Sequence, residues 1–173
     1  EDKSGGINGV KVNLADASQN AGIYALGDTY QNIQHVVGTA FKDELYGDSQ
    51  NNSLSGGSGD DLLSGGAGRD TLNGGAGTDT VSYASVALGS GIVVSLKAPA
   101  SNTGDASGDT YVSIENLIGS RNNDSLEGDT GTNVIDGGGG DDEIRGGIGN
   151  DVIFGDAGAD RLYGGRGNDE LTG

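Results

Sequence analysis

A nine-residue repeat constrains this chain more than any other feature. Eleven repeats begin at residue 38, with an interruption between residues 83 and 118, and each has Gly at its first place. The eighth place is always Leu, Ile or Val, and the sixth is Asp in nine repeats and Asn in two. Agreement at three places over so many repeats predicts a solenoid, in which each repeat packs on its neighbours.

The pattern also predicts the local structure of each repeat. The last three residues form a short strand with the apolar residue facing inward, and the first six form a turn in which Gly permits positive φ. Two repeats make one coil, so residues 18 positions apart stack at a β-sheet spacing of about 4.8 Å. The predicted core is the ladder of eighth-place residues: Leu45, Leu54, Leu63, Leu72, Val81, Leu126, Ile135, Ile144, Ile153, Leu162 and Leu171.

The chain also contains a longer repeat, which includes a flanking segment and the nonapeptides that follow it. The phrase GVKVNL at Gly9 matches GIVVSL at Gly91, and GDTYQNIQHVVG at Gly27 matches GDTYVSIENLIG at Gly108. The chain therefore divides into two modules: residues 1–82, with flanking segment 1–37 and roll 38–82, and residues 83–173, with flanking segment 83–118 and roll 119–173. Alternating apolar residues predict short strands at 10–14 and 92–96, and a further apolar piece covers 33–37.

Composition narrows the classes of partner. The net charge is -17, with 26 acidic and 9 basic residues and no run of Lys or Arg, so neither nucleic acid nor an anionic membrane surface is expected to bind. No apolar run is long enough to span a bilayer, and without Cys there is no disulfide or thiolate metal site. The chain begins without Met or a signal peptide and stops at the first place of a further repeat, so we expect a piece of a longer protein.

Stacking gives the sixth-place residues a chemical role. Carboxylates from neighbouring coils would approach closely, and unpaired they would repel one another. A calcium ion between them removes that repulsion, and turn carbonyls can complete its shell of about six to eight oxygens. Magnesium prefers tighter octahedral sites, and zinc is not expected with no Cys and one His.

The repeats at 56–82 and 137–172 resemble the RTX family, the haemolysin-type calcium-binding repeats of proteins exported by bacterial type I secretion systems. The resemblance implies an all-β, right-handed parallel β-roll with calcium along both rows of turns. It also implies that odd-place backbone oxygens serve one ion, while even-place oxygens and the sixth-place side chain serve its neighbour.

Carried over residue by residue, the resemblance implies seven or more calcium ions between stacked turns. The sixth-place ligands would be Asp43, Asn52, Asp61, Asp70, Asp79, Asp124, Asn133, Asp142, Asp151, Asp160 and Asp169. The backbone ligands would be Gly56, Ser58, Gly65, Ala67, Gly74, Ala76, Gly137, Gly139, Gly146, Ile148, Gly155, Ala157, Gly164 and Arg166. The second place departs from Gly at Thr39, Asp48, Ser120, Asp129 and Asp156, so the sites bordered by 38–55 and 119–136 fit the pattern least well.

Asp28 and Asp109, in the matching GDTY phrases, have two interpretations. They are either further calcium ligands at the edges of the rolls or plain turn caps. Tyr30 and Tyr111 in the same phrases are expected to cover the roll rather than to form a platform for a sugar.

The expected function is a non-enzymatic calcium-binding module of a secreted or cell-surface bacterial protein. It would fold on calcium outside the cell, and the resemblance names the type I secretion machinery as a partner of the longer protein. The alternative is a calcium-stiffened spacer, or a region that contacts a surface glycan, in an adhesin or surface-layer protein. No nucleophile motif accompanies His35, the single imidazole, so no catalytic residue is assigned and any enzyme or toxin activity would lie elsewhere.

Overall fold

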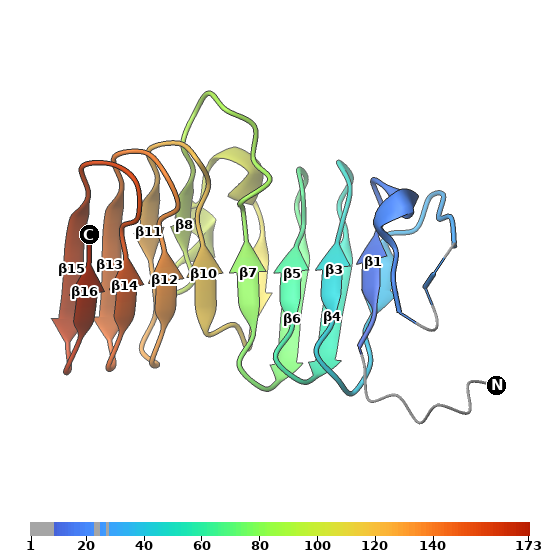
Figure 1. Ribbon diagram of the computed structural model, residues 1–173, viewed down its shortest axis with the longest axis horizontal. Coiled ribbons are helices and arrows are strands. Elements are labelled where there is room, and N and C mark those ends of the chain that lie inside the picture. Colours follow the sequence, from blue (N-terminus) through green and yellow to red (C-terminus); the bar gives the residue numbers. More distant parts are fainter. Residues whose placement is uncertain (1–8, 23–24, 27) are drawn as a thin grey trace.

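The chain winds as a parallel β-solenoid, as the nonapeptide pattern predicts (Figure 1). The computed structural model describes residues 9–22, 25–26 and 28–173, so the predicted flanking segment 1–37 lies partly outside the described residues. In Figure 1 the chain ascends the front sheet and descends behind it while advancing from right to left, which makes the coil right-handed.

One face of the solenoid is a single eight-stranded sheet that runs its full length (Figure 1). All of its strands are parallel and three residues long. In spatial order they are β1 (Lys11–Asn13), β3 (Glu44–Tyr46), β5 (Leu62–Ser64), β7 (Thr80–Ser82), β10 (Asn116–Ile118), β12 (Val134–Asp136), β14 (Val152–Phe154) and β16 (Glu170–Thr172).

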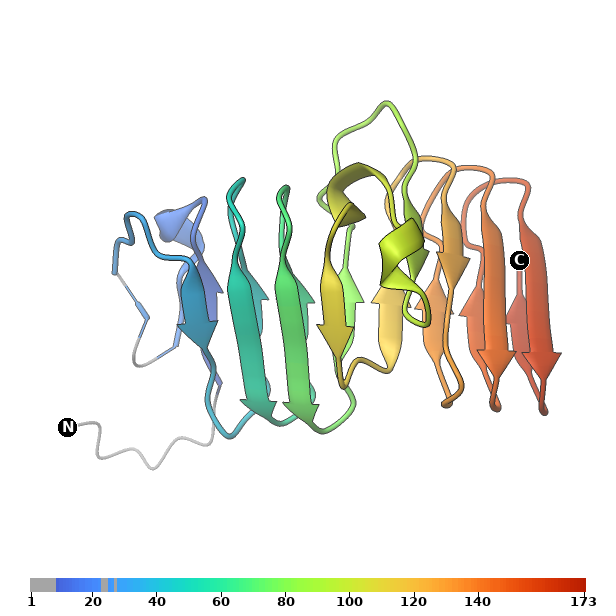
Figure 2. The same cartoon turned by 180° about the vertical axis from the view of Figure 1, so that it is seen from behind.

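The opposite face consists of two four-stranded sheets (Figure 2). The first contains β2 (His35–Val37), β4 (Ser53–Ser58), β6 (Thr71–Ala76) and β9 (Thr110–Val112). The second contains β8 (Val93–Ser95), β11 (Ser125–Glu127), β13 (Glu143–Ile148) and β15 (Arg161–Arg166). In the described residues the helical segments are the 3₁₀ turns η1 (Ala17–Gln19), η2 (Pro99–Ser101) and η3 (Gly104–Ala106), and none is long enough to cross a membrane.

The core is the predicted ladder of eighth-place residues. Strand pairing puts residues 18 apart in register, with Leu45 beside Leu63 and Ile144 beside Leu162. The nine eighth-place residues from Leu45 to Ile153 are fully buried, whereas Leu171 in the last strand is 42% exposed. A narrow solenoid can therefore be stabilised by one apolar residue per repeat, because each is covered by its neighbours on both sides.

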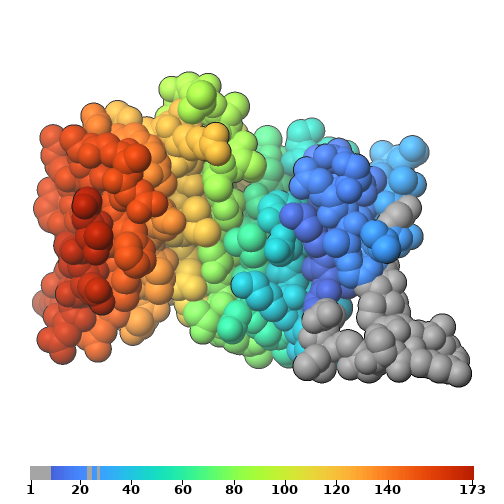
Figure 3. Space-filling view, viewed as in Figure 1, coloured from blue at the N-terminus to red at the C-terminus, as the bar shows by residue number. Residues whose placement is uncertain are grey.

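The segment between the two rolls serves both of them. After β7 the chain passes to β8, which pairs with β11 of the second roll, and then returns through η2 and η3 to β9 beside β6. β10 then pairs with both β7 and β12. The space-filling view shows an unbroken surface from the first roll to the second (Figure 3). The boundary at residues 82 and 83 stays a prediction.

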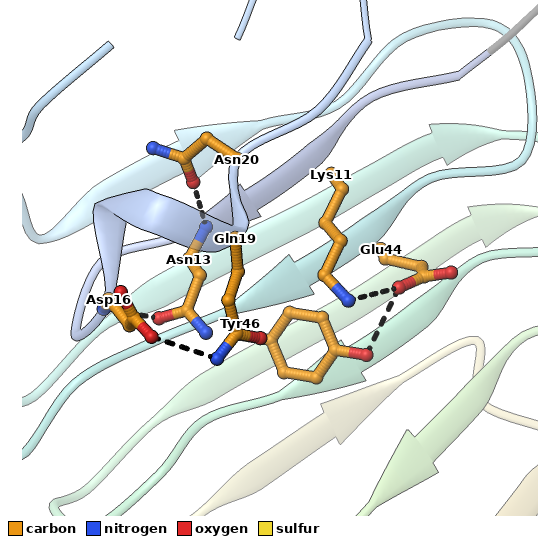
Figure 4. A network of polar contacts seen from close by, with 7 residues as sticks. All are labelled: Lys11, Asn13, Asp16, Gln19, Asn20, Glu44 and Tyr46. Carbon is orange, nitrogen blue, oxygen red and sulfur yellow. Dashed lines mark hydrogen bonds and ion pairs between the residues drawn. The ribbon is translucent and has the colours of Figure 1, made fainter. Parts of the chain in front are cut away.

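The two flanking segments fold alike where both are described. An antiparallel bridge joins Lys11 to Ala21 in the first and Val93 to Thr103 in the second. An Asn side chain then accepts a backbone N–H: Asn20 from Asn13 at 2.6 Å, and Asn102 from Ser95 at 2.8 Å. In the first segment a polar network including the 3.0 Å ion pair of Lys11 with Glu44 ties β1 to β3 (Figure 4).

Replacing a core residue tests whether the ladder carries the stability. Leu63 is fully buried, so we expect Leu63→Ala to reduce the free energy of unfolding by about 2–5 kcal/mol. Leu88, in the loop after β7, is 77% exposed and provides the control, because Leu88→Ala removes the same atoms without opening a cavity. Urea unfolding in saturating calcium measures both, and equal losses would contradict the ladder as the core.

Candidate metal centre

Each sixth-place side chain lies at the end of a turn, directly before a strand. In seven of the eleven, one side-chain oxygen accepts a hydrogen bond from the backbone N–H of the sixth-place residue 18 positions earlier. Asp61 accepts from Asp43 and Asp142 from Asp124, each at 2.8 Å. The same bond joins Asn52 to Asp70, Asp61 to Asp79, Asn133 to Asp151, Asp142 to Asp160 and Asp151 to Asp169. The structure therefore brings together all seven pairs of turns that the sequence predicts, in two rows.

The second oxygen of these carboxylates is left without a partner. Oδ2 is buried and accepts no hydrogen bond in Asp61, Asp70, Asp79, Asp142 and Asp151. An unpaired buried carboxylate oxygen costs several kcal/mol unless a donor or a cation reaches it, roughly 2–7 kcal/mol even for a neutral polar group. These five oxygens of sixth-place carboxylates, with Asp136 Oδ1 as a sixth buried carboxylate oxygen in the same situation, point to a cation as their partner.

A backbone carbonyl faces four of these five oxygens, those of Asp61, Asp79, Asp142 and Asp151, across a first-place glycine. A Cβ added to Gly56 would collide with Asp61 Oδ2 on one side and with the carbonyl oxygen of Gly74, in the next coil, on the other. Gly137 sits in the same way between Asp142 and Gly155, and Gly146 between Asp151 and Gly164. Only glycine fits where the two oxygens converge, which explains its presence at every first place.

Even-place carbonyls point toward the next coil. Gly57 and Gly59 have φ of 111° and 116°, a conformation that favours glycine. Their carbonyl oxygens lie where a Cβ of Gly75 or Gly77 would be. Some turn carbonyls also accept an N–H across coils: the third-place carbonyls of Ala76, Ala157 and Arg166 accept one from the preceding coil at 2.8 Å, and the second-place carbonyl of Gly138 accepts one from Ala157 at 3.1 Å. Each of these keeps one free lone pair for an ion.

The donor set fits calcium better than a transition metal. In the described part of the chain, no three His, Cys, Asp or Glu side chains gather at one point. Each turn instead offers one carboxylate and several carbonyl oxygens, which are the hard oxygen ligands that calcium takes in numbers. The residues present therefore fit calcium, which the sixth-place Oδ2 atoms and the turn carbonyls would hold, and the assignment of individual ligands stays a prediction.

The first two turns of each roll differ from the rest. Thr39 donates its N–H to Asp43 Oδ2 at 2.5 Å, and Ser120 donates to Asp124 Oδ2 at 2.6 Å. In the next turn Asp48 donates to Asn52 at 2.8 Å and Asp129 to Asn133 at 2.9 Å. In these four turns the second place is not glycine, and the sixth-place oxygens already have donors. The fifth second place that is not glycine, Asp156, has a positive φ of 62° like the glycines. The role of these four sixth-place residues as calcium ligands stays a prediction.

The side chain of Asp109 contacts distant parts of the roll, and its role as a calcium ligand or a turn cap stays a prediction. It is 1% exposed, and its oxygens accept the N–H of Asp70 at 2.8 Å and the hydroxyl of Tyr83 at 2.6 Å. Asp28 is exposed. Its side chain accepts a 3.5 Å bond from the Tyr30 hydroxyl, its carbonyl accepts from Asn20, and its N–H donates to the Ala25 carbonyl at 3.2 Å. Tyr111 covers the roll as expected, since its hydroxyl bonds Asn102 and Tyr83.

Two residues of this centre were missed in the sequence. Glu115 takes a sixth-place role at the junction, where its Oε2 accepts the N–H of Asp79 at 2.8 Å. Ser113 supplies the carbonyl that faces Asp79 Oδ2 across Gly74, so the row of turns continues through the interruption. Glu115 lies 18 residues before Asn133, so the 18-residue period of the coil could have predicted its position.

Burial changes the acidity of the open carboxyls. It raises the pKa of Asp61, Asp70 and Asp142 to about 6, and it raises the pKa of Asp79 and Asp151 as well. Backbone N–H donors oppose the shift, and neighbouring carboxylates add to it: Asp43 and Asp79 both raise the pKa of Asp61. Without a cation, Asp61, Asp70 and Asp142 therefore keep their protons up to about pH 6.

This shift predicts a pH dependence of the metal-free fold. The folded pKa of Asp61 is about 6 and its ordinary value is 3.8, so the folded state binds protons that the unfolded state releases. The metal-free fold should be most stable below pH 4 and lose that stability as pH rises to about 6. Urea unfolding without calcium measures this. Asp61→Asn should weaken the dependence more than Asp60→Asn at its exposed neighbour, and equal effects would contradict it.

Comparison with known families supports the metal chemistry. The family described as RTX calcium-binding nonapeptide repeat matches in four places, at residues 35–63, 46–81, 113–144 and 136–171. Comparison with curated proteins finds no relative. The matched residues cover both rolls and more than half of the chain, including every turn with an open carboxylate. This protein belongs to the RTX family of calcium-binding nonapeptide repeats.

Proposed function

We propose that calcium binding folds this chain and that the folded module acts outside the bacterial cell. The observation that supports this is the set of five buried Oδ2 atoms without a hydrogen-bond partner. Each is held in place by the other oxygen of the same carboxylate, which is fixed to the preceding coil. A chain of charge -17 gains little from assembling such a row unless cations enter with it.

Calcium supplies a positive charge and a high coordination number at these positions. The chain contributes the Asp oxygen from one turn and the first-place carbonyl from the next, so each ion joins two coils. Seven inter-turn sites would bring a charge of about +14 against -17. Binding only to the folded state makes the binding free energy part of the folding free energy.

The coupling of calcium binding to folding also explains how this module would support secretion of the longer protein. Where free calcium is low the acidic chain stays unfolded, which suits export through a narrow channel. Outside the cell calcium is abundant, and the module folds. Membership of the RTX family supports this proposal, because the repeats resemble those of bacterial proteins exported by type I secretion systems.

A second function, as a calcium-stiffened spacer, is favoured by one feature of the fold. The eight-stranded sheet passes from β7 to β10 to β12 without interruption, so the two rolls form one continuous rod. A rod of this kind would hold two parts of a surface protein apart. The contacts of Tyr111 do not favour a sugar platform, because its hydroxyl is engaged inside the protein.

A calcium titration tests the coupling of binding and folding. At neutral pH the metal-free chain should lack a β signal in circular dichroism and should gain it cooperatively at about 10⁻⁴–10⁻³ M calcium, as in other extracellular modules. Chelation should reverse the change, and magnesium should produce it poorly. A β signal that is already complete in chelator would overturn the proposal.

A pair of neighbouring substitutions tests the carboxylate row. Asp142→Asn keeps the acceptor for Asp124 N–H but places an amide where Oδ2 faces the Gly155 carbonyl. It should raise the calcium concentration at the folding midpoint by about tenfold, a loss of ~1.4 kcal/mol. Asp141→Asn removes the same charge at an exposed side chain and should leave the midpoint nearly unchanged. Calorimetric titration would refute the assignment if both variants bound calcium alike.

A further inference from the structure

The last turn of the first roll lies against a turn that is not a nonapeptide. Residues 113–115 lead from β9 to β10, and these strands pair with β6 and β7 of the first roll (Figure 2). The carbonyl oxygen of Asp79 accepts the N–H groups of Glu115 and Asn116, at 3.1 and 2.9 Å. Residues 113–115, which we call the junction turn, therefore lie directly on turn 74–79.

One carboxylate oxygen of turn 74–79 is open toward the junction turn. Asp79 is 0% exposed, and its Oδ1 accepts the N–H of Asp61 at 2.8 Å. Its Oδ2 is buried and accepts no hydrogen bond from the described part of the chain. A Cβ added to Gly74 would collide both with this oxygen and with the carbonyl oxygen of Ser113. Two buried oxygens thus converge at the junction, as Asp61 Oδ2 and the Gly74 carbonyl do inside the roll.

The junction turn reaches this position by a different backbone path from that of a repeat. Strand pairing puts Tyr111 beside Leu72 and Leu117 beside Val81, so the chain takes three residues fewer to pass from one sheet to the other. Ser113 has φ of 50°, in the left-handed region that is uncommon for residues other than glycine. The junction turn is therefore not one of the nonapeptide turns, although it presents a carbonyl at the same point.

A second carboxyl group lies beside the open oxygen. Glu115 Oε2 accepts the N–H of Asp79 at 2.8 Å. Burial raises the pKa of Asp79, and the charges of Glu115 and Asp60 raise it further. Because a buried negative charge is costly unless it is paired, this group of oxygens favours a cation as its partner.

The opposite row of turns provides a contrast at the same junction. There Asp109 accepts the N–H of Asp70 with one oxygen at 2.8 Å and the hydroxyl of Tyr83 with the other at 2.6 Å. Both oxygens of that carboxyl group have protein donors. Asp79 has no equivalent of the Tyr83 hydroxyl among the described residues, so its second oxygen is left for a partner from solution.

We propose that Asp79, Ser113 and Glu115 form a calcium site at the junction, in addition to the sites between the nonapeptides. Asp79 Oδ2 and the Ser113 carbonyl would bind the ion directly, and Glu115 would supply a second negative charge. Gly75 has φ of 108°, close to that of Gly57, and would direct its carbonyl to the same ion. Water would complete the shell of about six to eight oxygens that calcium takes. This inference rests on the proposed function, because it extends calcium binding from the rolls to the segment between them.

An ion at this place would join the two modules. β10 pairs with β7 on one side and with β12 on the other, so the front sheet of the second roll starts from the strand that follows the junction turn. Holding the junction turn on turn 74–79 fixes the start of that strand. Calcium binding would thus couple the two rolls, so that they fold in one calcium-dependent transition rather than in two.

Counting bound calcium tests the site. Asp79→Asn keeps an acceptor for the Asp61 N–H but places an amide where Oδ2 faces the Ser113 carbonyl. In native mass spectrometry this variant should bind one calcium ion fewer than the original chain, at a calcium concentration where circular dichroism shows both to be folded. Asp60→Asn removes the same charge at an exposed residue nearby and should bind the full number. If Asp79→Asn bound as many ions as Asp60→Asn, the junction site would be refuted.

A second variant tests the site if Asp79→Asn does not fold. Glu115→Gln keeps an acceptor for the Asp79 N–H and removes one negative charge, so calcium at the junction should bind about tenfold more weakly. The N–H groups of Asn116 and Val152 report on the junction and on the second roll in a calcium titration followed by NMR. The midpoint at Asn116 should move to about tenfold higher calcium and separate from that at Val152. Glu170→Gln, the same change at an exposed residue, should leave both midpoints in place.

These measurements separate the junction site from calcium-driven folding itself. An original chain that folds on calcium, with midpoints at Asn116 and Val152 that stay together in Glu115→Gln, would refute the junction site and leave the proposed function intact. An original chain that is already folded in chelator would contradict the proposed function, whatever the variants do.

Discussion

The carboxylate between two turns is the interaction on which this structure depends. One oxygen of Asp61 is fixed to the backbone of the preceding coil, and the other is directed at a carbonyl of the following coil. Each such Asp therefore contacts the preceding and the following coil as well as its own. All of these carboxylates are oriented in the same way along the row. The second oxygen is buried and has no donor. The 18-residue spacing that stacks the apolar ladder therefore also produces buried negative charge that a cation can neutralise. Core packing and metal binding are consequences of a single period.

The backbone conformation at the second place of the repeat decides whether the carboxylate oxygen receives a protein donor. Where the second place is glycine, as at Gly57 or Gly147, φ is positive and the Asp oxygen stays open, and Asp156 has a positive φ of 62° as well. Where it is Thr39 or Ser120, the backbone N–H turns to the carboxylate and satisfies it. The two Asn residues fit the same logic, since Asn133 accepts from Asp129 and donates to the Glu115 carbonyl at 2.7 Å. Each roll thus begins with two turns closed by protein donors and continues with turns open to a cation.

The periodic part of the sequence predicted most of the fold and of the candidate site. Strand positions, the buried ladder and the seven stacked pairs follow from a three-residue strand and an 18-residue coil, because stacking leaves no other choice. The flanking segments have no such period, so the return of the chain from β8 to β9 could not be foreseen. For the same reason Glu115 was missed: its longer side chain reaches the sixth-place position from a different backbone path.

The spacing of the two modules explains why the rod is continuous on one face only. Their 81-residue offset is an odd number of nonapeptides, so equivalent strands fall on opposite faces: β3 lies in the eight-stranded sheet and β11 behind it. One row of turns nevertheless passes the junction, from Asp79 to Glu115 by a carboxylate contact and from Glu115 to Asn133 by an amide. The second oxygen of Asp79 stays open beside these links and faces the Ser113 carbonyl across Gly74. The turn at the junction therefore keeps the same pair of buried oxygens as the turns inside the rolls, in addition to its protein contacts.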